Sequence, residues 1–268
     1  GAAYAWLSRS TAGGGRIAPL PPAKADSAGK RLLLAFALAV LLLFCALPLA
    51  AVLVQAAQAG GSWQVLWEEE TRLAAWNTLR FTATAVAAAL ALGISHAALA
   101  RRLPWIRGIT FLPFMVSPVC VAFGILLLYP EWTASLPLLT ATYALLAYPF
   151  VTKDLLAAWD ALPPQYAAAA RSMGANRFQT ACYVTAPLLL PAMRRGLTLA
   201  AATCIGEFAA TLFLSRPEWL TLTTLIYQYL GTAGAENHDR AMVLTAALMM
   251  LAAVVFVLLD AAEREKAV

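Results

Sequence analysis

Charged residues are scarce in this chain. Asp, Glu, Lys and Arg together make up only 12% of the 268 residues, which is about half the share found in an average soluble domain. Hydrophobic residues make up 62%, and the mean hydropathy is +0.72. This composition excludes an ordinary soluble globular domain and predicts a polytopic membrane protein.

Cysteine and histidine are also rare, which bears on metal and redox chemistry. The four cysteines and two histidines have no metal-ligand spacing, and no nucleophile, base and orienting group occur together. The phosphate-binding motif G-x-x-x-x-G-K-[ST] is missing too, because Gly29-Lys30 lacks the upstream glycine and is followed by Arg31. We expect four free thiols, no metal site, no cofactor bound by this chain and no enzyme activity of its own.

Long apolar runs, in contrast, are abundant. Six stretches have about 18 or more residues with few charges, which is the length needed to cross the hydrocarbon core of a bilayer. Every backbone donor and acceptor must find a partner within such a segment, so each is expected to be a helix. The sequence therefore predicts an all-α fold with six transmembrane helices near residues 32–54, 73–100, 109–129, 133–151, 196–214 and 241–259.

The distribution of Lys and Arg predicts the orientation of these helices. If the N-terminus is cytoplasmic, 15 of the 19 basic residues fall on the inside. Cytoplasmic segments of membrane proteins carry an excess of Lys and Arg. We therefore expect both termini in the cytoplasm. The net charge of +5 then reports topology, and no nucleic-acid partner is needed to explain it.

The chain divides into three parts by composition. Residues 1–30 contain a Gly13-Gly14-Gly15 run and three prolines, which is typical of a linker or a cytoplasmic arm. Two interpretations fit this start: the chain is the second half of a longer fused protein, or it carries an ordinary N-terminal arm. Residues 31–262 form the predicted membrane domain, and residues 263–268 a cytoplasmic tail.

One segment between two apolar runs, residues 153–195, is predicted to stay in the cytoplasm. Pro163-Pro164 suits a helix N-terminus, and Gly174 suits a turn between two helices. We expect short helices over residues 165–173 and 176–184, with Pro187 starting the next long helix. From the residues alone, this insert either packs on its own bundle or offers a partner a small-residue surface with Arg171 and Arg177 as polar contacts.

A family resemblance favours the second interpretation. The run PPQYAAAARSMGANRFQTACYVTAPLLLP resembles the cytoplasmic "EAA" loop of ABC importer permeases, whose pattern is Glu-Ala-Ala, three residues, Gly, nine residues, then Ile-x-Leu-Pro. The position of the family's Glu is occupied by Ala168, and the Leu position by Ala186, so a salt bridge from the Glu position is not expected. The matching positions are Ala169, Ala170, Gly174, Val184 and Pro187.

The resemblance implies a function and a set of partners. The insert would be the coupling helix that docks on a separate ABC ATPase subunit dimer, so that ATP acts only through that partner. A periplasmic binding protein would deliver substrate at the outer side. A second permease half, whether fused, separate or a second copy, would complete the pathway in a bacterial inner membrane, with lipid around it.

The fifth apolar run contains an acid, Glu207, which we expect near the middle of the bilayer. A charge there is costly, so the side chain must pair, protonate or face a wet pathway. The alternatives are a hydrogen-bonded packing residue and a pathway residue for a cation, with Gly206 allowing close helix approach and Phe208 beside it.

Residues 205–231 resemble the matching region of permeases in the thiamine and ferric-iron group of ABC importers. This implies thiamine or its phosphates as substrate, with ferric iron as the alternative. From a different class, a secondary transporter could use Glu207 as an ion relay.

Overall fold

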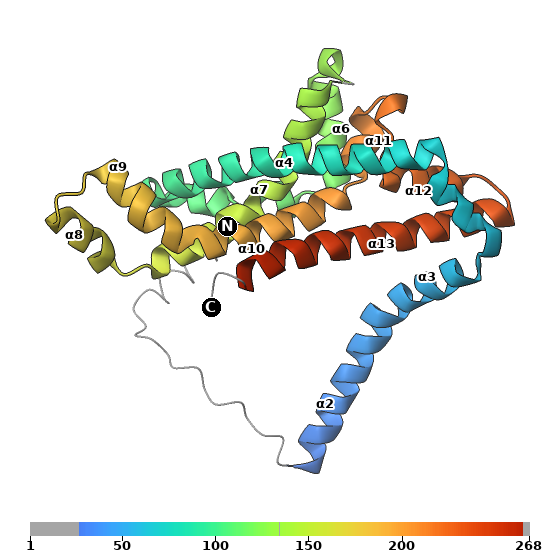
Figure 1. The fold of residues 1–268 in the computed structure, drawn as a ribbon, viewed down its shortest axis with the longest axis horizontal. Coiled ribbons are helices and arrows are strands. Elements are labelled where there is room, and N and C mark those ends of the chain that lie inside the picture. Colours follow the sequence, from blue (N-terminus) through green and yellow to red (C-terminus); the bar gives the residue numbers. More distant parts are fainter. Residues whose placement is uncertain (1–26, 134, 265–268) are drawn as a thin grey trace.

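The computed structural model describes residues 27–133 and 135–264, and all regular secondary structure in that part is helical. The predicted all-α fold is therefore confirmed there. Four helices form the bundle in Figure 1: α4 (Glu69–Arg102), α7 (Leu136–Ala161), α10 (Ala186–Ile205) and α13 (Ala235–Arg264). Most of the predicted tail and nearly all of the predicted linker lie outside the described residues.

Close packing in the bundle centres on α7. Val151 of α7 lies between Gly93 of α4 and Gly196 of α10. A Cβ on Gly93 would lie 2.7 Å from Val151 Cγ1, and a Cβ on Gly196 would lie 2.7 Å from Val151 Cα. Small residues allow membrane helices to approach in this way. The core around this contact includes Phe81, Ala85, Ala89, Leu139, Tyr143, Ala144, Ala147, Ala200 and Cys204.

The first apolar run contacts the bundle only near its C-terminal end, where Ala56 shares a core cluster with Val243 and Leu244 of α13. α2 (Ala28–Leu41), the π-helical turn η1 (Leu42–Ala46) and α3 (Leu47–Gln58) form one helical rod that extends away from the other helices in Figure 1. No residue of α2 is buried, and only Ala56 of α3 is. The π-turn precedes Pro48, which has no N–H to continue the regular ladder.

Within the described residues, four helices are long and apolar enough to cross a membrane, namely Ala28–Gln58, Glu69–Arg102, Arg177–Ile205 and Ala235–Leu259. α7 covers the predicted fourth span but is not among these four. It is the central helix, and the polar side chains of Thr142, Tyr143 and Thr152 are buried against its neighbours, so it does not need an apolar surface all round. The predicted count of six spans is not confirmed.

The predicted third span is broken. The segment consists of the 3₁₀ turn η3 (Pro104–Ile109), the short helix α5 (Leu112–Met115) and α6 (Pro118–Leu128). Val116 and Ser117 have extended backbone angles. The residue before a proline is disfavoured in the α conformation, so Pro118 ends one helix and begins the next. The prediction of one continuous helix over residues 109–129 was wrong.

The region around the predicted fifth span also differs. α9 (Arg177–Thr180), the π-turn η5 (Ala181–Thr185) and α10 form one continuous helix. The predictions that residues 176–184 form a separate short helix and that Pro187 starts a new one were wrong, because a π-turn accommodates the missing N–H of Pro187. The helix ends at Ile205, and α11 (Ala209–Leu214) follows after a break, so residues 196–214 are not one helix.

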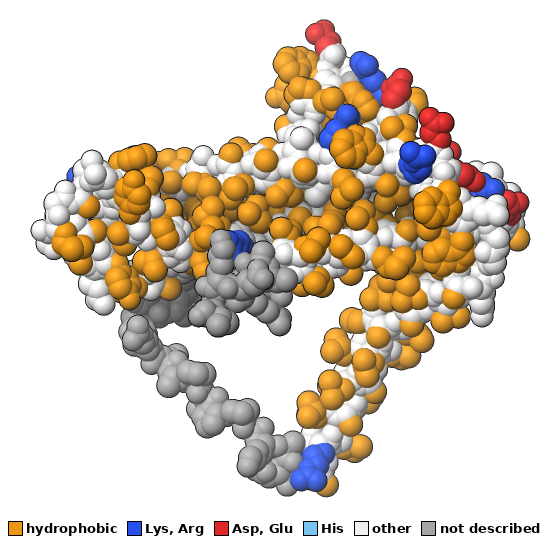
Figure 2. All heavy atoms as spheres, viewed as in Figure 1, with side chains coloured by type: hydrophobic (Ala, Val, Ile, Leu, Met, Phe, Trp, Pro, Cys, Tyr) orange, Lys and Arg blue, Asp and Glu red, His pale blue; other side chains and the backbone are white. Residues whose placement is uncertain are grey.

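The two ends of the bundle have different characters. At one end, called the α8 end, α8 (Pro164–Ser172) projects beyond the bundle in Figure 1. At the other, called the α12 end, lie α12 (Leu222–Gly231) and the 3₁₀ turns η2 (Gly60–Trp67) and η6 (Pro217–Trp219). The 3₁₀ turn η4 (Pro130–Trp132) follows α6 at the tip of the part that projects sideways from the bundle in Figure 1. Figure 2 shows acidic and basic side chains along the edge that runs from the tip of the α6 projection to the α12 end, while apolar side chains cover most of the bundle between its two ends.

Candidate functional site

The first candidate site is the projecting segment from Pro164 to Asn176, here called the knob. Pro164 occupies the first turn of α8, as predicted. Gly174 has φ +91°, so the turn uses the left-handed conformation that glycine adopts without strain. The Gly174 N–H donates to the Arg171 carbonyl at 3.0 Å, and the Ala175 N–H donates to the Ala170 carbonyl at 3.1 Å. This pair of bonds is the Schellman motif, and it satisfies carbonyls that end the helix.

A second cap fixes the other side of the turn. The Gln179 N–H donates to Asn176 Oδ1 at 2.8 Å, and the Asn176 N–H donates to Gln179 Oε1 at 2.9 Å. Such a reciprocal capping box satisfies two donors that would otherwise lack partners. Both sides of the Gly174 turn are therefore closed by local hydrogen bonds, and the knob has a defined shape without help from the bundle.

The structure separates the residues predicted for this loop. Ala169, Arg171 and Arg177 are exposed on or beside the knob, whereas Ala170 is buried. Val184 and Pro187 lie farther along the continuous helix that leads into α10, in and just after its π-turn. The Arg171 Nε donates to the Ala167 carbonyl at 3.1 Å, so this side chain lies along α8.

Sequence reasoning missed the large apolar side chains of this region. Met173 is 82% exposed and Phe178 is 75% exposed, one on each side of the Gly174 turn. Tyr166 and Tyr183 are exposed as well. Such residues gather at sites that another protein covers. The signal was present in the sequence, because Met173 and Phe178 stand in a segment predicted to lie outside the membrane.

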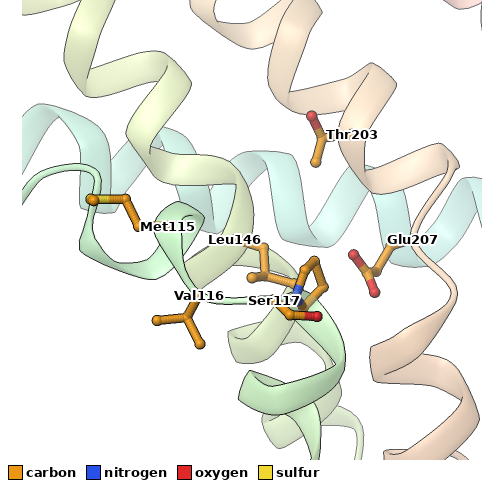
Figure 3. Close-up of a pocket in the computed structure, with 7 residues that line it drawn as sticks. Met115, Val116, Ser117, Leu146, Thr203 and Glu207 are labelled. Atoms are coloured by element: carbon orange, nitrogen blue, oxygen red, sulfur yellow. The ribbon is translucent and has the colours of Figure 1, made fainter.

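The second candidate site is a pocket beside Glu207, with a volume of about 540 Å³. The broken segment contributes Met115, Val116, Ser117 and Pro118, α7 contributes Leu146, and α10 contributes Thr203. Figure 3 shows the Glu207 carboxylate pointing from the break after α10 toward the α5–α6 junction. Two helix breaks, at Val116–Ser117 and at 206–208, therefore face the same space.

The Glu207 carboxylate also has a structural partner. The Ala210 N–H, in the first turn of α11, donates to Glu207 Oε1 at 3.1 Å. A carboxylate at a helix N-terminus satisfies a free N–H and interacts favourably with the helix dipole. Glu207 is only 8% exposed. The side chain thus caps α11 and lines the pocket. Both predicted interpretations, a hydrogen-bonded packing residue and a pathway residue for a cation, are compatible with this position.

The neighbours of Glu207 do not line the pocket. Gly206 ends α10, and a Cβ there would meet only the Ala202 and Thr203 carbonyls of its own helix, at 3.8 and 4.0 Å. The close helix approach expected at Gly206 occurs instead at Gly196. The ring of Phe208 packs on Tyr227 of α12, with centroids 5.1 Å apart.

The break after α10 is held by side chains from two other helices. The Glu207 carbonyl accepts hydrogen bonds from Tyr143 Oη of α7 at 3.2 Å and from Thr223 Oγ1 of α12 at 3.0 Å. Tyr143 also shares a hydrogen bond with Thr211. Backbone groups freed by a helix break in a membrane need such partners. Sequence reasoning missed these residues, whose signal is a hydroxyl within or beside an apolar segment.

α12 is in turn fixed to α4. Asn77 Nδ2 donates to the carbonyls of Glu218 and Leu220, each at 3.0 Å. The Leu222 N–H donates to Thr78 Oγ1 at 3.0 Å. Hydrogen bonds therefore join α4, α12, α7 and the break at residues 206–208, which borders the pocket.

The two histidines take structural positions. His96 Nε2 lies 2.9 Å from Thr110 Oγ1, and His238 Nε2 lies 3.2 Å from Gln55 Oε1. In the described part of the chain, no group of three or more His, Cys, Asp or Glu side chains could hold a metal ion.

A helical membrane bundle with a pocket between two helix breaks and a rigid projecting knob has the architecture of a transport protein. Residues 89–262 match the family model described as "Binding-protein-dependent transport system inner membrane component". The chain belongs to this family and is a membrane-embedded permease of the ABC importer type. In this family the ATPase is a separate subunit.

Individual relatives agree with this assignment. The sulfate transport system permease protein CysT of Escherichia coli strain K12 is 27% identical over 237 residues, which cover 76% of this chain and 83% of that protein. The molybdenum transport system permease protein ModB of the same strain is 30% identical over 128 residues, covering 46% of this chain and 56% of that protein.

A solved structure shows the same fold. A chain of a bacterial alginate ABC transporter, crystallised in complex with an alginate pentasaccharide-bound periplasmic protein, superposes with a TM-score of 0.70 at 19% identity. The superposition covers 88% of this chain and 93% of the other.

Proposed function

We propose that this chain forms one half of the pathway of an ATP-driven importer in the bacterial inner membrane. It would take a small solute from a periplasmic binding protein and couple to an ABC ATPase dimer through the knob. The observation that carries this proposal is the knob, where a Schellman turn at Gly174 and a capping box at Asn176 fix a projecting helix.

The exposed side chains of the knob and of the first turn of α9 fit a protein partner. Met173 and Phe178 provide apolar anchors on both sides of the turn, and Arg171 and Arg177 provide directional polar contacts. Interfaces commonly have apolar anchors surrounded by polar groups, with Arg among the residues that contribute most to binding. ATP would act only through this partner, and this chain would bind no cofactor.

The charge of the pocket lining indicates the charge of the substrate. Its lining includes one carboxylate, that of Glu207, and no basic side chain. A carboxylate attracts a cation and repels an oxyanion. Among the substrates that the resemblance of residues 205–231 implies, we therefore keep the cation thiamine as the first candidate, with ferric iron as the alternative cation. Thiamine phosphates carry oxyanions, so this lining favours them less than thiamine itself.

The relatives favour a second candidate, a small oxyanion. Their names refer to sulfate, molybdenum and 2-aminoethylphosphonate transport. An oxyanion route would require basic groups from the second permease half to offset Glu207. The secondary-transporter alternative loses its support, because the family match covers residues 89–262.

The test uses the transporter assembled in lipid vesicles with its ATPase and its binding protein. Gly174→Val places a β-branched residue at φ +91°, a conformation that costs such residues about 1–2 kcal/mol. We expect copurification with the ATPase and solute uptake to fall about five- to thirtyfold, with unchanged membrane insertion. Gly61→Val is the matched control, because Gly61 lies at the α12 end and a Cβ there meets nothing within 4 Å.

Uptake of labelled thiamine, ferric iron, sulfate and molybdate by the wild type then identifies the substrate class. Normal ATPase assembly and normal uptake by Gly174→Val would contradict the role of the knob. Uptake of sulfate or molybdate, without thiamine or iron, would contradict the cation assignment.

A further inference from the structure

The end of α7 connects directly to the knob. α7 ends at Ala161, and Pro163 is already the N-cap residue of α8. Asp160 lies in the last turn of α7, so it must follow any displacement of the knob. The side chain that holds Asp160 comes from η3, the turn that follows α4.

Arg107 of η3 holds Asp160 with two parallel hydrogen bonds. Arg107 Nη1 lies 2.6 Å from Asp160 Oδ2, and Arg107 Nη2 lies 3.0 Å from Asp160 Oδ1. The same guanidinium donates from Nε to the Ala100 carbonyl in the last turn of α4, at 3.3 Å. A bidentate pair between planar groups fixes direction as well as distance. One side chain thus links the end of α4, η3 and the end of α7.

The same elements lead to the pocket. After η3 the chain continues into α5, whose last residue Met115 lines the pocket together with the junction before α6. α7 itself contributes Leu146 to that lining. Two connections therefore lead from the Arg107–Asp160 pair to the pocket. One runs along α7, and the other runs through η3 and α5.

We propose that Arg107 and Asp160 are positioning residues that transmit displacement of the knob to the α5–α6 junction. This inference rests on the proposed docking of the knob on the ATPase. With the pair intact, η3 follows the end of α7, and the two sides of the pocket move together. Without it, α7 can move while η3 stays behind, and ATP hydrolysis is no longer accompanied by opening of the pathway.

Stability alone does not account for this arrangement. The Arg107 and Asp160 side chains are 38% and 43% exposed, and ion pairs at such positions contribute little to folding. The bidentate geometry instead fixes the position and orientation of η3 relative to the end of α7. The consequence to look for is a loss of coupling with the fold retained.

The experiment measures solute transported per ATP hydrolysed by the complete transporter in lipid vesicles. Arg107→Gln and Asp160→Asn should each lower this ratio about two- to fivefold, the range that an exposed ion pair can supply. Melting temperature and copurification with the ATPase should stay at wild-type values. Because the two residues act as one unit, the double variant should lose no more than either single variant. The exchange Arg107→Asp with Asp160→Arg should restore part of the ratio.

Arg102→Gln is the matched control. It removes the same charge from the same end of α4, where Arg102 is exposed and has no ion pair among the described residues. The inference would be overturned if both single variants kept the wild-type ratio of solute transported to ATP hydrolysed. It would also be overturned if Arg102→Gln lowered this ratio equally, or if the ratio fell in parallel with the melting temperature. Failure of the wild type to assemble with the ATPase would instead overturn the proposed function on which the inference rests.

Discussion

At the residue scale, the position of Glu207 allows its carboxylate both to cap α11 and to line the pocket. Its carboxylate accepts from the Ala210 N–H and so caps α11, while the same group lines a pocket between two helix breaks. A membrane carboxylate usually needs a partner, and α11 supplies one. A neutral acceptor at position 207 would be enough to cap α11. Attraction of a cation, in contrast, requires the negative charge of the carboxylate.

The substitution Glu207→Gln separates these roles. The amide oxygen of the new side chain can still accept from the Ala210 N–H, so the melting temperature should change little. If the charge assists a cation, uptake should fall at least about tenfold, which corresponds to the loss of about 1.4 kcal/mol. Glu131→Gln, at an exposed acid in η4, serves as the control. Normal uptake by the Glu207→Gln variant would leave Glu207 with the capping role alone.

Glu207→Leu tests the capping role itself. Leucine fills similar space but leaves the buried Ala210 N–H without a partner, which costs about 1–3 kcal/mol. We expect a lower melting temperature in detergent than for Glu207→Gln. Equal melting temperatures would show that the cap contributes nothing to stability.

At the element scale, α4, α7 and α10 pack closely at Val151, which lies between Gly93 and Gly196. Gly196→Ala would place a Cβ 2.7 Å from Val151 Cα and 3.2 Å from the Phe150 carbonyl. Both neighbours are backbone atoms, so a helix must shift, at a typical cost of about 1–3 kcal/mol. We expect a clear fall in the melting temperature of the purified protein.

Gly124→Ala provides the matched comparison within another helix. A Cβ on Gly124 of α6 meets nothing within 4 Å, and Ala is preferred to Gly inside a helix by about 0.5–1 kcal/mol. This variant should be as stable as the wild type or slightly more stable. If both substitutions had the same effect, close packing at Val151 would not explain the sensitivity of Gly196 to an added methyl group.

At the scale of the whole molecule, the two ends differ in charge and in shape. At the α12 end, the ion pair of Arg240 with Glu68, at 3.1 Å, joins α13 to the segment before α4, and a second ion pair of Arg240 with Glu236, at 2.8 Å, lies within α13. The α8 end has the knob and the Arg107–Asp160 pair. The positive-inside rule predicts that the α8 end faces the cytoplasm.

Cysteine labelling of whole cells tests this orientation. In a background that lacks the four native cysteines, single cysteines at the exposed residues Trp105 and Met173 should react only from the cytoplasm. Cysteines at the exposed residues Glu69 and Ala233 should react only from the periplasm. An impermeant maleimide, applied before and after permeabilisation, gives the readout. Reaction at position 173 in intact cells would reverse the whole orientation.

The sequence by itself determined the features that depend on local chemistry. Long apolar runs define the helices α4 and α13, and the positive φ of Gly174 follows from a glycine after an Ala-rich helix. The start of α8 at Pro164 likewise needs only the preference of proline for a first helical turn. The knob could therefore be placed from the sequence, although its exposed anchors Met173 and Phe178 were overlooked.

Only the tertiary structure decided where apolar runs break. The apolar pattern of residues 205–214 predicts a continuous membrane helix, yet the helix stops at Ile205, because Tyr143 of α7 and Thr223 of α12 satisfy the carbonyl of Glu207. At Pro187 the opposite occurs, since a π-turn keeps the helix intact. The partner of Asp160 is likewise 53 positions away in the chain. Such outcomes depend on hydrogen-bond partners distant in sequence, which local patterns do not encode.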